Sequence, residues 1–137
     1  MTTLTIDVEE YSFEAAVHED VAPESVEAMR EFLPLESTLL HVRYSGIATW
    51  IEIDEIDLPE LPRENHTAYP SRGDVLLYPG YRNEQEILIA CGPTRFGSPA
   101  GELAGNPVAT IDAPATLKEL EERTLQEGAF DVTLRFE

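Results

Sequence analysis

Two arginines in the sequence each stand close to an aromatic residue, a combination that suits recognition of a planar anion. Arg43 precedes Tyr44 and lies close to Trp50, the single tryptophan, while Arg95 precedes Phe96 in a glycine-rich segment. A guanidinium group can bind a carboxylate through two parallel hydrogen bonds, and an aromatic ring adds apolar contact. Each arginine has an alternative role, because pairing with one of the many Asp and Glu residues would also occupy it.

The histidines do not form a metal-binding pattern. His18, His41 and His66 are widely spaced, and no two of them make an HxH or HxxxH pair. A zinc site would require distant segments to converge, so we expect no metal and no cofactor. His66 is the histidine best placed to contact a ligand, because it lies in a long loop beside Glu64 and Asn65.

Other patterns of catalytic sites are also missing from the sequence. Cys91 ends a predicted strand with no cation beside it, so we expect a buried and unreactive thiol. The segment GSPAGELAG has no lysine and opens no helix, which excludes a P-loop. The acidic segment EIDEID lacks the spacing and the turn glycine of an EF-hand. The sequence therefore assigns no catalytic residue.

The chain is strongly acidic, with 27 Asp and Glu against 9 Lys and Arg and a formal net charge of −18 over 137 residues. Such a charge repels nucleic-acid phosphates and anionic membrane surfaces, so we expect neither as a partner. The N-terminus lacks the basic and apolar regions of a signal peptide, and no stretch reaches the roughly 18 apolar residues of a membrane helix. One cysteine excludes an intrachain disulfide, and we expect a cytoplasmic protein of bacterial type.

Alternation of apolar and polar residues predicts eight short strands. They lie at residues 4–8, 11–17, 40–44, 47–53, 75–77, 87–89, 108–110 and 130–136. Several carry apolar residues on both faces, as strands covered on both sides do. Without a repeated βαβ unit, eight strands predict a mainly β fold closed into a barrel, because closure leaves no edge to pair with other chains. The length suits one domain, which we expect to span residues 1–137.

Two segments change to a helical period. Residues 23–33 start with a proline and are stopped by Pro34. Residues 116–127 start at Thr116, the expected N-cap of a capping box, and stop before Gly128. We therefore expect two short helices beside the barrel.

Two connections, residues 54–73 and 92–106, are long and rich in proline or glycine. Loops of this length in a compact domain are usually functional or disordered. If strand direction alternates along the chain, both loops and the first helix lie at the same end of the barrel. We therefore expect the second loop to form the rim of a binding site at that end.

Four segments carry a resemblance to known proteins. SFEAAVHEDVAPESVEAMREFLP places an acidic residue, a short spacer, a proline and a serine between a strand and a helix, and it resembles the opening of a cyclophilin. LLHVRYSGIATWIEI, ENHTAYPSRGDVLLYPG and ACGPTRFGSPAGELAGNPVATI resemble small bacterial families of unknown function that share the cyclophilin-like barrel. Together these segments cover most of the chain, and the resemblance implies a cyclophilin-like closed eight-stranded barrel with two short helices.

The same resemblance does not extend to the catalytic signature of cyclophilins. True prolyl isomerases follow their His-Arg pair with a glycine, an aromatic residue and a Gln-Gly-Gly-Asp run, which the corresponding residues 41–50 do not contain. Arg43 is also shifted by one residue, and such a shift on a strand turns a side chain to the opposite face. The resemblance therefore implies the fold without prolyl isomerase activity.

The leading hypothesis is a non-enzymatic barrel that binds a small carboxylate-bearing molecule or a short peptide. The expected ligand-binding residues are Arg43, Trp50, His66, Arg95 and Phe96. One alternative is a small enzyme, either a degenerate prolyl isomerase or a hydrolase or isomerase acting on an amide or carboxylate substrate. Another is an accessory subunit that docks on a partner enzyme through an exposed apolar patch. The sequence is also compatible with a homo-oligomer.

Overall fold

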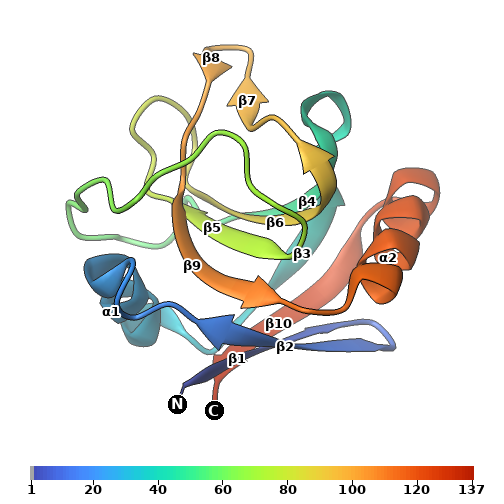
Figure 1. Cartoon of the computed structure of the whole chain (residues 1–137), viewed down its shortest axis with the longest axis horizontal. Helices are drawn as coiled ribbons and strands as arrows, with labels where there is room; N and C mark the ends of the chain where they lie inside the picture. The colour runs from blue at the N-terminus through green and yellow to red at the C-terminus, as the bar shows by residue number, and fades with distance from the viewer. Residues whose placement is uncertain (1) are drawn as a thin grey trace.

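The computed structural model describes residues 2–137, and its main feature is a closed antiparallel barrel (Figure 1). The barrel strands are β1 (Thr3–Val8), β2 (Tyr11–Val17), β3 (Leu35–His41), β4 (Gly46–Glu52), β5 (Asp74–Tyr78), β6 (Glu86–Thr94), β9 (Asn106–Ile111) and β10 (Phe130–Phe136). Their order around the barrel is β1-β10-β3-β4-β6-β5-β9-β2. Two short strands, β7 (Gly97–Ser98) and β8 (Gly101–Glu102), form a separate hairpin. The predicted mainly β fold with eight barrel strands is confirmed.

Side-chain alternation along each strand fills the barrel interior. In β2, Tyr11, Phe13 and Ala15 are buried, while Ser12 and Glu14 between them are exposed. Successive side chains of a strand point to opposite faces, so this pattern places three apolar residues in the core. A fully buried Leu, Ile or Phe contributes about 1.5–3 kcal/mol through burial, and the barrel is held together mainly by such residues.

The third strand differs from its prediction. The sequence pattern placed it at residues 40–44, but β3 runs from Leu35 to His41 and pairs with β10 through residues 35–39. Only Leu39 of this strand is fully buried, so the strand carries a weak apolar pattern. The chain then forms a 3-10 turn, η1 (Arg43–Ser45), which the alternating pattern did not reveal.

The two helices lie close to their predicted positions. α1 (Pro23–Phe32) and α2 (Pro114–Glu127) each have a proline in the first turn, which suits the fixed backbone angle of that residue. The predicted capping box at Thr116 is wrong, because α2 begins earlier and Thr116 lies inside its first turn. Gly128 ends α2 as predicted, with a φ of 94°. No helix within residues 2–137 is long and apolar enough to span a membrane.

The long loops do not gather at one end of the barrel, contrary to the sequence-based expectation. β6 lies between β4 and β5 and is antiparallel to both, so β4 and β5 run in the same direction. By the same reasoning β6 and β9 run in the same direction, because both are antiparallel to β5. The connections from β4 to β5 and from β6 to β9 must therefore each travel the length of the barrel.

These two connections cover the outer face of β4, β5 and β6 with a second, smaller core. This outer cluster consists of Ala48, Leu76, Tyr78, Leu88, Phe96 and Leu103. Backbone hydrogen bonds join the loops to each other, since Thr67 and Gly105 form an isolated bridge and the Phe96 N–H donates to the Ala68 carbonyl at 2.7 Å. The central strands are therefore covered on both faces, as the sequence predicted for several strands.

Candidate functional site

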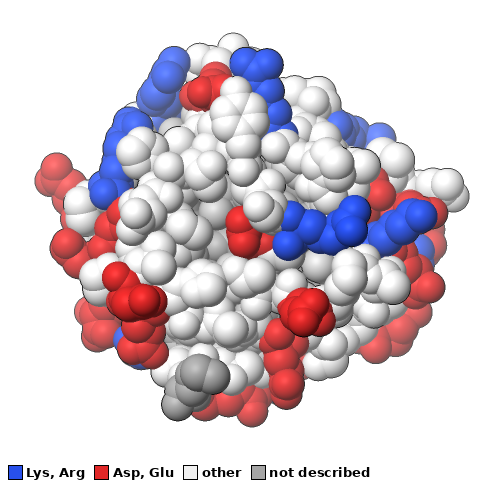
Figure 2. All heavy atoms as spheres, viewed as in Figure 1, with Lys and Arg blue, Asp and Glu red and all other residues white. Residues whose placement is uncertain are grey.

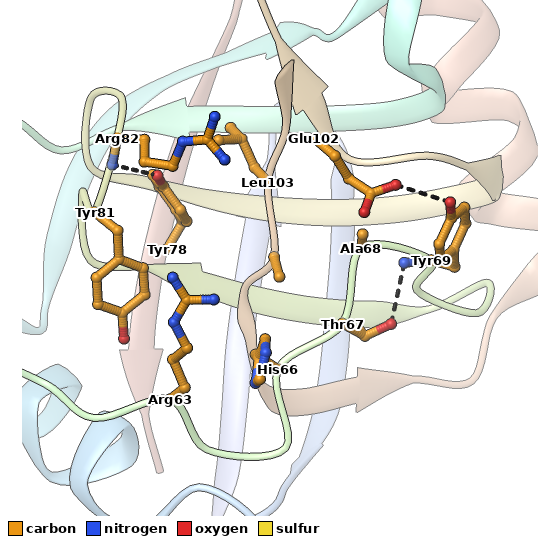
Figure 3. Close-up of a pocket in the computed structure, with 11 residues that line it drawn as sticks. Arg63, His66, Thr67, Ala68, Tyr69, Tyr78, Tyr81, Arg82, Glu102 and Leu103 are labelled. Carbon is orange, nitrogen blue, oxygen red and sulfur yellow. Dashed lines mark hydrogen bonds between the residues drawn. The ribbon is translucent and has the colours of Figure 1, made fainter. Parts of the chain in front are cut away.

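A pocket of about 530 Å³ opens between the two long loops, and we call it the loop pocket (Figure 3). Its lining residues come from the 54–73 loop, the end of β5, the β5–β6 turn and the 92–106 loop. They are Arg63, His66, Thr67, Ala68, Tyr69, Tyr78, Tyr81, Arg82, Glu102, Leu103 and Ala104. The pocket thus exists because both loops return along the same outer face of the barrel.

Glu64 fixes the first loop in place beside the loop pocket. α1 has no side-chain cap of its own, and the Glu64 carboxylate instead accepts hydrogen bonds from the backbone N–H groups of Glu24 and Ser25 at 3.0 and 2.8 Å. A carboxylate at a helix N-terminus satisfies unpaired N–H groups and interacts favourably with the helix dipole. The backbone N–H of Glu64 also donates to Asn106 on β9 at 3.0 Å. These contacts position the neighbouring Arg63.

Aromatic side chains form a rigid part of the wall. The buried Tyr78 packs edge-to-face against Tyr81 and Phe96, with ring centroids 5.8 and 5.5 Å apart. The Tyr78 hydroxyl accepts a hydrogen bond from the backbone N–H of Arg82 at 2.7 Å, which fixes the β5–β6 turn. The Tyr81 hydroxyl donates to the Leu61 carbonyl at 2.9 Å, and burial raises the pKa of Tyr81. The wall therefore offers apolar ring surface with its polar groups already satisfied.

Two arginines reach the loop pocket from different loops. The Arg63 guanidinium lies over the Tyr81 ring, 4.8 Å from its centroid, and an Nη atom of Arg82 donates to the Ala100 carbonyl at 3.0 Å. Neither arginine forms an ion pair within residues 2–137, whereas four other arginines of the chain do. In a protein with a net charge of −18, this leaves two guanidinium groups beside one pocket with their charge available to a ligand.

One carboxylate lines the loop pocket, and its charge is balanced within the protein. Glu102 accepts a hydrogen bond from the Tyr69 hydroxyl at 2.8 Å and lies 3.5 Å from Nε of Arg95. The hydrogen bond to Glu102 raises the pKa of Tyr69. On the face drawn in Figure 2, acidic side chains crowd the lower part of the molecule, and basic side chains lie both at the top, beside an acidic group, and at the right, over α2. The charged side chains that line the loop pocket are therefore two arginines without an ion pair within residues 2–137 and one carboxylate that is paired with Arg95.

The predicted site residues lie in different places. His66 lines the loop pocket, as described. Trp50 and Phe96 lie together on the wall of a smaller pocket of about 100 Å³, which we call the aromatic pocket. Arg95 and Phe96 line a third, shallow depression of about 260 Å³ next to it. Phe96 lies between these places. It lines the aromatic pocket with Trp50 and the third depression with Arg95, and its ring packs on Tyr78, which lines the loop pocket with His66.

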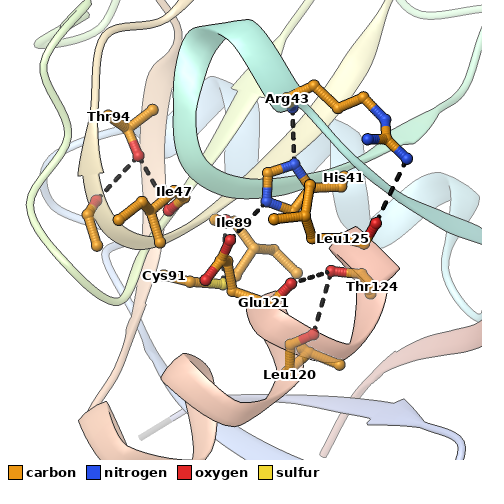
Figure 4. A network of polar contacts seen from close by, with 11 residues as sticks. His41, Arg43, Ile47, Ile89, Cys91, Thr94, Leu120, Glu121, Thr124 and Leu125 are labelled. Atoms are coloured by element: carbon orange, nitrogen blue, oxygen red, sulfur yellow. Dashed lines mark hydrogen bonds and ion pairs between the residues drawn. The ribbon is translucent and has the colours of Figure 1, made fainter. Parts of the chain in front are cut away.

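Arg43 lies outside these three pockets. It has a φ of 62° in the η1 turn, and its side chain extends toward α2, where an Nη atom is 3.5 Å from the Leu125 carbonyl (Figure 4).

Sequence reasoning missed Arg63 and Arg82. Arg82 carried a usable signal, because it follows Tyr81 in the same arginine-beside-aromatic pattern that singled out the other arginines.

A buried polar pair lies on the other side of β6, between β3 and α2 (Figure 4). Nε2 of His41 is 2.7 Å from the Glu121 carboxylate, and Nδ1 of His41 accepts the backbone N–H of Arg43 at 2.7 Å. Because Nδ1 accepts, the ring proton sits on Nε2 and is donated to Glu121. Nearby, Cys91 is buried as expected, and burial raises the pKa of its thiol to about 12. This arrangement joins the helix to the barrel and offers no activated nucleophile.

Comparison with known proteins supports the fold. The family model described as protein of unknown function (DUF3830) matches residues 4–136. The structure of McbB in complex with tryptophan is 19% identical, with a TM-score of 0.75 over 96% of this chain, which spans only 44% of McbB. A hypothetical protein, AF2241 from Archaeoglobus fulgidus, is 20% identical, with a TM-score of 0.61 over 98% of this chain and 93% of its own. No curated protein matches the sequence.

Proposed function

Because this chain belongs to the DUF3830 family, whose function is unknown, we propose its function from the geometry of the loop pocket. We infer that it binds a small molecule or a short peptide that carries a carboxylate. The observation that carries this proposal is the pair of arginines, Arg63 and Arg82, that line the loop pocket without an ion pair in residues 2–137.

The geometry favours a carboxylate over other ligand classes. A guanidinium group recognises a carboxylate through two parallel hydrogen bonds, and two such groups beside one pocket strengthen this preference. The Tyr81 ring under Arg63 holds the guanidinium in place and supplies apolar contact for the rest of the ligand. The overall negative charge opposes binding only at long range, because exposed charges are screened beyond about 8 Å at physiological salt.

One of the similar structures indicates which ligands to test first. McbB has been solved in complex with tryptophan, a molecule that combines a carboxylate with an aromatic ring. A pocket of about 530 Å³ lined by three tyrosines has room for a ligand of this size. We therefore propose aromatic carboxylates, including tryptophan, as the first ligand class for this chain.

We also propose that the barrel is cyclophilin-like and that it lacks prolyl isomerase activity. Residues 41–50 have no Gln-Gly-Gly-Asp run, and Arg43 extends toward α2 instead of lining a pocket described above. Cis-to-trans conversion of a proline tetrapeptide should proceed at the uncatalysed rate when the protein is added. Acceleration that is lost in Arg43→Ala would contradict this part of the proposal.

The binding proposal is tested by calorimetric titration with a panel of aromatic and aliphatic carboxylates and their uncharged amides. We expect carboxylates to bind and amides to bind much more weakly. Arg63→Gln or Arg82→Gln should each weaken binding about 10- to 100-fold, since a hydrogen bond to a charged group contributes about 1.5–3 kcal/mol. The matched control is Arg72→Gln, which removes the same charge from an exposed arginine outside the loop pocket. Equal affinity in all four proteins would overturn the proposal.

A further inference from the structure

The aromatic pocket lies next to the loop pocket and has a different chemical character. The edge-to-face pair of Tyr78 and Phe96 stands between them, because Tyr78 lines the loop pocket and Phe96 lines the aromatic pocket. The aromatic pocket of about 100 Å³ is lined by the side chains of Tyr44, Trp50 and Phe96 and contains no Lys or Arg among its lining residues. It therefore combines ring surface with an absence of positive charge.

Glu86 is the unusual residue of this pocket. It is the first residue of β6, lines the aromatic pocket and is only 6% exposed. Within residues 2–137 its carboxyl group has neither an ion pair nor a side-chain hydrogen bond. Its carboxyl oxygens are not fully enclosed, because among residues 2–137 Oγ1 of Thr49 is the only fully buried side-chain polar atom without a hydrogen-bond partner. The carboxyl group of this otherwise buried residue is therefore accessible from the aromatic pocket that it lines.

The groups around Glu86 are acidic or neutral. Glu52 on β4 lies directly across from it in the sheet, Glu84 precedes it in the β5–β6 turn, and Tyr78 is its partner on β5. Tyr44 from η1 completes the titratable groups that line the pocket. Burial, followed by the charges of Glu84 and Glu52, raises the pKa of Glu86 to about 8. At neutral pH this carboxyl group is therefore mostly protonated, and a bound cation would take the place of its proton.

We propose that the aromatic pocket binds a small organic cation of the alkylammonium class, whose charge contacts Glu86 and whose alkyl groups contact the rings of Trp50 and Phe96. Aromatic faces attract such cations through the negative charge density of the ring, most strongly at a tryptophan and where water is excluded. Inorganic Ca²⁺ would need six or more oxygen ligands, and no group of three or more His, Cys, Asp or Glu side chains within residues 2–137 is arranged to hold a metal ion. The net charge of −18 attracts cations at long range.

The ligand of this site differs from that of the loop pocket, so the two proposals stand or fall separately. The suitable probe is tetramethylammonium, because its charge does not change with pH. Trp50 is the only tryptophan and lines the pocket, so its fluorescence reports binding directly. We expect a saturable fluorescence change with tetramethylammonium and none with tert-butanol, an uncharged molecule of similar shape.

Two variants test the role of the carboxyl group. Glu86→Gln keeps the shape and should weaken tetramethylammonium binding at least about tenfold, since it removes the charge that the cation contacts. Glu31→Gln removes the same charge from the exposed face of α1 and should leave binding unchanged. Circular dichroism verifies that both variants fold. Equal affinity in wild type and Glu86→Gln, or equal binding of tert-butanol, would overturn the proposal.

The pH dependence gives a readout that a purely structural role would not produce. A cation stabilises the ionised form of Glu86, so the affinity for tetramethylammonium should rise about tenfold per pH unit up to about pH 8 and level off above it. Below this pH, binding should release close to one proton, measured by calorimetry in two buffers of different ionisation enthalpy. Absence of any saturable signal between about pH 6 and 9, or binding without proton release below pH 8, would contradict the site.

Discussion

Replacement of Glu86 by glutamine should stabilise the protein, and the gain should depend on pH. The folded protein holds the pKa of Glu86 at about 8, against an ordinary value of 4.5. Between these values the folded state keeps a proton that the unfolded chain releases, so the free energy of unfolding falls as pH rises from 4.5 to about 8. Glutamine resembles the protonated acid in shape and does not titrate, so the variant avoids this loss.

The magnitude follows from the size of the pKa difference. The interval from 4.5 to about 8 is 3.5 pH units, and each unit corresponds to about 1.36 kcal/mol. The glutamine variant can therefore gain at most about 5 kcal/mol in free energy of unfolding above pH 8, and about 3 kcal/mol at pH 7. Relaxation of the structure around a buried charge lowers such values, and we expect a measured gain of about 2–4 kcal/mol at pH 9.

The assay is urea unfolding of wild type and Glu86→Gln at about pH 5, 7 and 9, with Glu31→Gln as the control for the general effect of removing one negative charge. Wild type and Glu86→Gln should have nearly equal free energies of unfolding at pH 5, and the difference between them should grow as pH rises. Equal unfolding midpoints at pH 9, or a gain no larger than that of Glu31→Gln, would show that Glu86 is not held protonated by its surroundings.

Two substitutions and one labelling experiment test other parts of the structure. Asn106→Ala should lower the free energy of unfolding by about 2–4 kcal/mol, because the buried amide donates to Ser25 and accepts from Glu64; an unchanged urea midpoint would refute this. Gly73→Ala should lower it by about 2 kcal/mol or more, since φ is 94° and a Cβ would lie 2.1 Å from a carbonyl oxygen of β9; a thermal melt that matches wild type would count against that strain. Cys91, with its thiol pKa at about 12, should react with Ellman's reagent only when the protein unfolds, and rapid reaction in native buffer would contradict its burial.

The sequence predicted the barrel because most strands have one strongly apolar face. In β2 and β10 the first, third and fifth side chains are buried, so period-two alternation locates these strands to within a residue or two. β3 was misplaced because it buries a single residue, Leu39, and its remaining positions are polar or half exposed. Thr116 was misassigned as an N-cap because Pro114 begins the helix one turn earlier without a side-chain cap.

The site was harder to predict because it depends on strand order. Nothing in the local pattern shows that β6 lies between β4 and β5, and this order is what sends both long loops across one outer face. The sequence indicated Trp50 and Phe96 because each ring stands near an arginine, and His66 because it lies in a long loop; all three line pockets on that face. Arg63 becomes a pocket residue only because Glu64 caps α1 and anchors the loop, a contact between segments about 40 residues apart.

The most direct test of the central claim is an NMR titration that observes the Nε–H groups of the arginines. Aromatic carboxylates, with tryptophan among them, should shift the signals of Arg63 and Arg82 with a common dissociation constant, because both guanidinium groups line the loop pocket. The signal of the exposed Arg72 should stay in place, and the corresponding uncharged amides should shift none of the three. If no carboxylate in the panel moves the Arg63 and Arg82 signals, or if Arg72 responds as strongly as they do, the loop pocket is not a carboxylate-binding site.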